Sequence, residues 1–202
     1  MPTEQRDRAI RALVERQPNA LQMAREVDGL WFRVQALAYA VRYATDEKIC
    51  TSIALEAFVS ADEIDDEYER VAVRAWPINA MMCRKLEPVL IESAIDKTLQ
   101  HCRDIKDPSR RAYALMVLTQ ATICDGDLWK RMSEIIMETA PETFHWRGQQ
   151  SIRDIVLLIG RLYPEEASRL IEAMPECKSK RQSAKRLAAG EFDTPHLFHW
   201  GK

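Results

Sequence analysis

The sequence lacks any apolar run that could cross a membrane. No run approaches the ~20 residues that a spanning helix needs, and the first eight residues, Met-Pro-Thr-Glu-Gln-Arg-Asp-Arg, are charged instead of apolar. Such a start predicts no signal peptide. The five cysteines are scattered and form no CxxC pair, which excludes a zinc ribbon and that type of redox motif. We therefore expect a cytoplasmic protein with reduced thiols and no membrane partner.

The sequence also lacks the common catalytic motifs. GxGxxG, P-loop and GxSxG patterns and a clear Cys/His pair are all missing. Glu142 and His145 have the ExxH spacing of carboxylate-bridged metal centres, which need a second such motif. The acidic cluster 62–69 lacks the glycine of a Ca²⁺ loop, and proximity to a helix N-terminus explains it. His196 and His199 near the C-terminus have no fixed geometry for a metal. We therefore expect no metal, no cofactor and no enzyme activity.

Charge of one sign is not in excess. With 29 basic and 31 acidic residues the net charge is −2, so nothing in the total favours nucleic acid or an anionic membrane as a partner. The segment 178–186 carries five positive charges. It is suited to the polar end cap that a repeat protein needs, or alternatively to an anionic partner; we favour the end cap.

Helical periodicity is present along nearly the whole chain. For example, Val71, Ala75, Ile78 and Met82 lie on one helical stripe, and no stretch alternates as a strand would. With proline and capping signals this pattern predicts helices over 3–16, 18–27, 30–44, 46–59, 65–83, 88–103, 108–124, 127–139, 147–162, 164–174 and 177–189. Pro77 lies inside one of them and predicts a kink or an early end there, more as a structural bend than as a functional hinge.

A repeat of about forty residues organises these helices. Arg-led segments begin at Arg33, Arg70 and Arg110, spaced by 37 and 40 residues, and a degenerate copy begins at Gln150. Such periods are typical of stacked units, because one helical hairpin cannot bury its own apolar face. The sequence therefore predicts an all-α superhelix (solenoid) of four to five antiparallel helical hairpins. It would form a single domain over residues 1–189, followed by a tail over 190–202.

The segment from Asp107 to Leu115 (Asp-Pro-Ser-Arg-Arg-Ala-Tyr-Ala-Leu) resembles the second helix of HEAT-type repeats. Weaker copies follow Asp28 and the pair at 65–66, whereas the fourth copy has His145-Trp146-Arg147-Gly148 in place of the aspartate. The resemblance covers residues 18–174, and the tetratricopeptide repeat fits less well. The resemblance to HEAT repeats implies an Asp–Arg ladder along the stack. It also implies that the Arg-led helices line an inner, concave face of the kind that such proteins use to bind partners.

These observations favour a non-enzymatic scaffold that binds another protein through its concave face. We expect the arginines of the repeated helices to share that face and to pair with acidic neighbours. The five tryptophans are expected mainly as buried anchors between helical layers, and one that is exposed in the groove would be a candidate hot spot. The candidate partner-binding residues are Arg33, Arg74, Trp76, Arg110, Arg111, Trp146, Arg147 and Arg153.

An alternative is a DNA glycosylase for alkylated bases, an enzyme class with a similar helical-repeat fold. Asp154 and Trp146 would be the nearest equivalents of its aspartate and its aromatic residues. The charge argues against this alternative, because phosphate contacts should leave a basic surface.

The tail is richer in apolar side chains than a solvated segment would be. Gly190 should end the last helix, and Phe192, Leu197, Phe198 and Trp200 follow it. We expect the tail to dock on the chain's own C-terminal repeats; the alternative is a linear motif offered to a partner or to a second copy.

Overall fold

The computed structural model describes residues 1–123, 125–194 and 197, and within these residues every regular element is helical. Eleven α-helices and one short 3-10 helix are described there, which confirms the all-α prediction. In chain order they are α1 (Pro2–Val14), α2 (Ala20–Arg25), α3 (Leu30–Tyr43), α4 (Glu47–Asp62), α5 (Glu67–Arg84), α6 (Pro88–Asp104), α7 (Pro108–Thr122), α8 (Gly126–Thr139), η1 (Ala140–Glu142), α9 (Trp146–Ile159), α10 (Pro164–Ala173) and α11 (Lys178–Ala188). None of these described helices is long and apolar enough to cross a bilayer.

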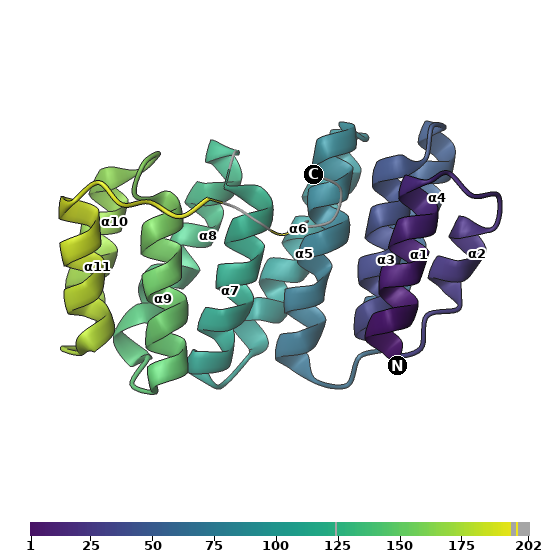
Figure 1. Cartoon of the computed structure of the whole chain (residues 1–202). Coiled ribbons are helices and arrows are strands. Elements are labelled where there is room, and N and C mark those ends of the chain that lie inside the picture. The colour runs from purple at the N-terminus through teal and green to yellow at the C-terminus, as the bar shows by residue number, and fades with distance from the viewer. Residues whose placement is uncertain (124, 195–196, 198–202) are drawn as a thin grey trace. The chain divides into compact units, whose positions relative to one another are not determined.

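The chain divides into two compact units, residues 1–99 and residues 100–197, with the boundary inside α6. In the first unit α3 packs against α1, α2, α4 and α5. Figure 1 shows α1, α3 and α5 side by side as one layer. Residues 34–41 of α3 are all buried, because α3 has neighbours on several sides. That residues 1–189 form one domain stays a prediction.

The second unit has the same arrangement. Helix α9 packs against α7, α10 and α11, and α7 packs against α8, so that α7, α9 and α11 form one layer (Figure 1). In both units consecutive helices pack as hairpins and each hairpin contacts its sequence neighbour, which is the packing of a helical solenoid. Apolar side chains of helical spacing, such as Leu115, Ile152 and Ile155, form its core.

A repeated hydrogen bond holds the loop in front of helices α3, α5 and α7. The Nε of Arg33 donates to the carbonyl oxygen of Val27 over 3.1 Å. Arg70 and Arg111 make the same bond, over 2.9 Å, to the residue six positions earlier, Ile64 and Ile105 respectively. In each case the residue that supplies the carbonyl is itself buried. The charged donor therefore satisfies a loop carbonyl that burial would otherwise leave without a partner.

The later repeats keep this bond with other donors. Lys180 donates to the carbonyl oxygen of Met174, again six positions earlier, over 3.0 Å. In front of α9, Gln149 makes a related bond to the carbonyl oxygen of Phe144, five positions earlier and exposed, over 3.0 Å. The structural register of the third copy is thus Arg111 and not Arg110. These contacts lie within one repeat, and the Asp–Arg ladder between repeats stays a prediction.

Local capping agrees with the sequence at several helix starts. Asp107 accepts hydrogen bonds from the backbone N–H groups of Ser109 and Arg110 at 2.8 and 3.0 Å, and Pro108 occupies the first helical position. Helix α5 runs through Pro77 to Arg84, so the early end that Pro77 suggested does not occur.

The described part of the tail lies on the second unit. The backbone N–H of Asp193 donates to the carbonyl oxygen of Leu157 in α9 over 3.1 Å. Arg186 of α11 forms ion pairs with Glu191 and with Asp193, each at 3.0 Å. Gly190 has a positive φ of 70° directly after the helix, as its predicted role as a helix terminator requires. These contacts agree with the predicted docking on the chain's own repeats, whereas His196, Phe198, His199 and Trp200 lie outside the described residues.

Candidate functional site

Several predicted partner-binding residues are used by the fold itself. Arg33 and Arg111 are half-buried and hold their loops. Arg153 donates through Nε and Nη2 to one carboxylate oxygen of Asp154, over 2.9 and 2.6 Å. Asp154, the aspartate of the glycosylase alternative, is therefore engaged by its neighbour in the sequence.

Trp76 is half-buried and packs edge-on against another tryptophan. Its ring lies 5.8 Å from that of Trp31, with the two planes at 68°, a favoured geometry for an aromatic pair. Because α3 and α5 lie side by side, this contact joins two repeats. The pair links two helices of one layer and is half-buried, whereas the sequence predicted tryptophans mainly as anchors between layers.

Arg74 is a core residue, only 1% exposed. Its Nε donates to the hydroxyl oxygen of Thr98 over 3.0 Å, and its Nη1 donates to a carboxylate oxygen of Asp62. Its guanidinium also lies 4.9 Å from the ring centre of Phe58. Lys97 pairs with the other carboxylate oxygen of Asp62 over 2.7 Å. This set, which we call the Arg74 cluster, joins α4, α5 and α6 within the first unit and leaves Arg74 unavailable to a partner.

The two ends of the Asp62–Arg74 pair lie in different environments. Burial of the carboxyl acts to raise the pKa of Asp62, but the hydrogen bond from Lys97 and the charge of Arg74 outweigh it and hold this pKa below its usual value. The Asp62 side chain is 37% exposed and that of Arg74 only 2%. The guanidinium is therefore the group that depends most on its counter-ion.

Exposed aromatic side chains gather at the start of α9. Phe144 is 76% exposed and Trp146 is 60% exposed. The guanidinium of Arg147 lies 5.3 Å from the centre of the Trp146 ring, and the ring of His145 lies 5.8 Å from it. We call residues 144–147 the aromatic corner. It contains two of the predicted residues, Trp146 and Arg147.

The backbone beneath the aromatic corner is closely packed. A Cβ added to Gly148 would lie 2.7 Å from the Cα of Ser109 and would also meet the side chain of Thr143. The start of α9 therefore lies directly against the start of α7. Gln149 holds the carbonyl of Phe144, as described above, and Thr143 is itself 1% exposed. Arg110, the residue after Ser109, is exposed. The close approach of Gly148 to Ser109 means that the packing of α9 against α7 holds the backbone of the corner in place.

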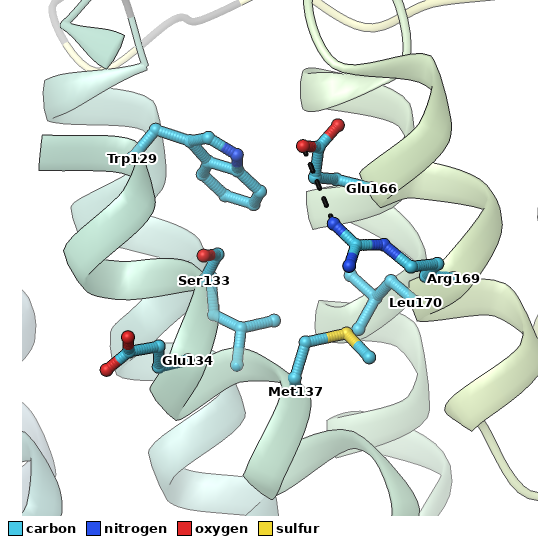
Figure 2. A pocket seen from close by; sticks show the side chains of 8 residues that line it. Trp129, Ser133, Glu134, Met137, Glu166, Arg169 and Leu170 are labelled. Carbon is cyan, nitrogen blue, oxygen red and sulfur yellow. Dashed lines mark ion pairs between the residues drawn. The ribbon is translucent and has the colours of Figure 1, made fainter. Parts of the chain in front are cut away.

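A pocket of about 220 Å³ lies between α8 and α10. Helix α8 contributes Trp129, Ser133, Glu134, Ile136 and Met137, and α10 contributes Glu166, Arg169 and Leu170. Figure 2 shows the Arg169 guanidinium turned toward Glu166, with 3.5 Å between the paired atoms. Trp129 is 3% exposed and stacks on Tyr163 at 5.4 Å, so its ring is a rigid wall.

Sequence reasoning did not select this pocket. Apolar residues at helical spacing in α8, such as Met132 and Ile136, form a buried stripe. Met137 is 36% exposed although it directly follows that stripe. Its exposure depends on where α10 lies, and the sequence of α8 carries no signal for that.

The described residues contain no group of three or more His, Cys, Asp or Glu side chains that could hold a metal ion. Glu142 and His145 are both exposed, and His145 instead caps α9 by accepting a hydrogen bond from the backbone N–H of Arg147 over 3.3 Å. Burial raises the pKa of the Cys102 thiol to about 12, which keeps it protonated and unreactive at neutral pH.

Comparison with known proteins identifies no family. No protein-family model, no curated protein and no solved structure matches the chain. Two surfaces of the second unit, the aromatic corner and the pocket between α8 and α10, are the candidate functional sites.

Proposed function

We propose that this chain is a HEAT-like helical-repeat protein of the cytoplasm, a non-enzymatic scaffold that binds another protein through the layer of repeated helices. The aromatic corner would be its main contact. The exposure of Phe144 and Trp146 is the observation that carries this proposal. Large apolar side chains that gather on a surface mark contact sites, and tryptophan and arginine are the residue types most enriched at binding hot spots.

The structure of the corner favours tight contact. Transfer of a large aromatic side chain from water into an interface contributes ~1.5–3 kcal/mol when burial is complete. The packing of Gly148 on Ser109 already orders the backbone here, which reduces the entropy that binding must remove. Arg147 is exposed and lies over Trp146. The partner surface should therefore be acidic around an apolar centre.

The positions of the predicted partner-binding residues also favour the aromatic corner as the binding site. Arg33, Arg111 and Arg153 make contacts within their own repeats, and Arg74 is in the core. Trp146 and Arg147 are exposed at the start of α9.

The proposal is tested by affinity capture from the native host, with quantitative mass spectrometry of the captured proteins. The variant Phe144→Ala/Trp146→Ala removes the aromatic corner. The matched control is Leu55→Ala/Val59→Ala on α4, where the two side chains are 52% and 60% exposed. Thermal unfolding should show that both variants fold.

We expect a partner that is captured by the unchanged protein and by the α4 control but lost with Phe144→Ala/Trp146→Ala. With the purified partner, the corner variant should weaken binding by about thirtyfold or more, as expected for two hot-spot side chains. Equal capture by all three proteins would refute the role of the corner.

A further inference from the structure

We propose that the pocket between α8 and α10 binds a basic amphipathic helix of a partner protein, which inserts one large apolar side chain. This inference goes beyond the proposed function, because it concerns a second surface of the unit and gives the chemistry of its ligand. Three features of the pocket carry it: its size, its lining and the charge of its α10 edge.

The size of the pocket fits a single side chain. Its volume of about 220 Å³ is smaller than the ~300–1,000 Å³ that is typical of sites for drug-sized molecules and cofactors. An anchor residue of a peptide needs less room than those ligands. A leucine or an aromatic ring, inserted from a helix lying along the groove, would use the available space.

The lining is apolar at the base and adaptable at one side. Trp129 and Leu170 are 3% and 1% exposed and form fixed walls. Met137 is partly exposed at the opening, and its flexible thioether can adjust to the shape of an incoming side chain. The groove between two neighbouring helices also offers a track along which a third helix can lie.

Charge selects a basic ligand. Glu166 lies on the α10 edge of the groove, whereas the carboxylate of Glu134, another lining residue, is turned away from α10 in Figure 2. Arg169 is the basic residue of the lining, and its guanidinium is already paired with Glu166. Helix α10 as a whole carries three glutamates against one arginine. A helix with lysine or arginine one turn from its apolar anchor would place positive charge beside the glutamates of α10.

The test uses the full chain and fluorescein-labelled synthetic helical peptides, with binding followed by fluorescence anisotropy. One peptide is lysine-rich with a central phenylalanine; a second has alanine at the anchor; a third has glutamate in place of each lysine. We expect binding of the first peptide only, with at least about a tenfold advantage over the other two. If the phenylalanine peptide does not bind up to about 1 mM, or binds no better than the alanine peptide, the proposal is wrong.

Two pairs of variants place the binding in the pocket. Ser133→Trp fills the pocket, and Ser168→Trp places the same bulk on an exposed position of α10 outside the lining. We expect the first to reduce affinity by at least tenfold and the second by less than about twofold. Equal affinity of the two would overturn the proposed location. Thermal unfolding of both variants confirms that they fold.

The second pair isolates the charge on the α10 edge. Glu166→Gln should weaken binding by about threefold or more, whereas Glu165→Gln changes the net charge equally on the same helix without touching the lining. Equal weakening by both would show general attraction of a basic peptide to an acidic surface and would overturn the proposed role of the α10 edge.

A site-specific signal completes the test. With ¹³C-methyl labelling of the eight methionines, the resonance identified by Met137→Leu should shift on addition of the phenylalanine peptide. Phe144→Ala/Trp146→Ala should leave this binding unchanged, so a failure of the proposed function and a failure of this inference give different results.

Discussion

The Arg74 cluster predicts an unequal response to loss of its two charged partners. Arg74 is enclosed, whereas the Asp62 side chain is 37% exposed and also pairs with Lys97. Removing the carboxylate leaves a buried guanidinium without a counter-ion. Removing the guanidinium leaves a carboxylate that keeps both water and Lys97. The more exposed residue should therefore be the more sensitive one.

The magnitudes follow from the contacts. Removing one partner of a buried ion pair costs ~3–5 kcal/mol, and the partial exposure of Asp62 places Asp62→Ala near the lower end, about 3 kcal/mol. Arg74→Met keeps most of the buried volume but loses the Thr98 hydrogen bond and the contact with Phe58. We expect this change to cost about 1–2 kcal/mol. Thr98 still donates to the carbonyl oxygen of Ala94 over 2.6 Å, which limits the loss.

Urea unfolding at pH 7 of Asp62→Ala, Arg74→Met and the double variant measures this asymmetry. In the double variant no charge is left buried, so it should be more stable than Asp62→Ala alone by about 1–2 kcal/mol. Lys97→Ala is the control and should cost less than about 1 kcal/mol, because Lys97 is 53% exposed. The reasoning fails if Arg74→Met costs as much as Asp62→Ala, or if the two losses are additive in the double variant.

The same cluster predicts a dependence on pH. The pKa of Asp62 in the folded chain is held below its ordinary value of 3.8. The stability that its charged form contributes is therefore present in full above pH 3.8 and is lost as the pH falls through the folded-state pKa. The difference in the free energy of unfolding between the unchanged protein and Asp62→Asn should be constant from about pH 5 to 7 and should shrink in more acidic buffer. A difference that grows on acidification would contradict this direction.

Three further predictions concern the second unit. In urea unfolding, Arg111→Ala should cost about 1–2 kcal/mol, because Arg111 holds a buried loop carbonyl, and exposed Arg110→Ala less than about 1 kcal/mol; equal losses would contradict the clamp. Gly148→Ala should lower Tm through its clash with α7, whereas Gly126→Ala, with 3.4 Å of space, should not; an unchanged midpoint for Gly148→Ala would argue against the close approach. Phe192→Ala, at a side chain 38% exposed, should cost about 1 kcal/mol and speed amide exchange in the tail, and a neutral result would remove the case for docking.

The sequence by itself determined the helices and much of their order. Helical spacing of apolar residues, Asp107 as an N-cap and Pro108 at the first helical position are signals whose physics is complete within a few neighbouring residues. The forty-residue spacing also predicted packing between neighbouring hairpins, because a hairpin with one apolar face must bury it on the next. Such features need no knowledge of where distant segments lie.

The tertiary structure decided what each side chain does. Arg74 and Arg147 look alike in the sequence, yet one is enclosed by α4, α5 and α6 and the other lies exposed on a tryptophan ring. The pocket beside Met137 exists only because α10 packs near α8 at a distance that leaves room for one side chain. Whether a side chain is buried, and whether space beside it stays unfilled, depends on contacts between segments far apart in the chain. A helical pattern specifies which face of a helix is buried, but it does not specify the gaps between packed faces.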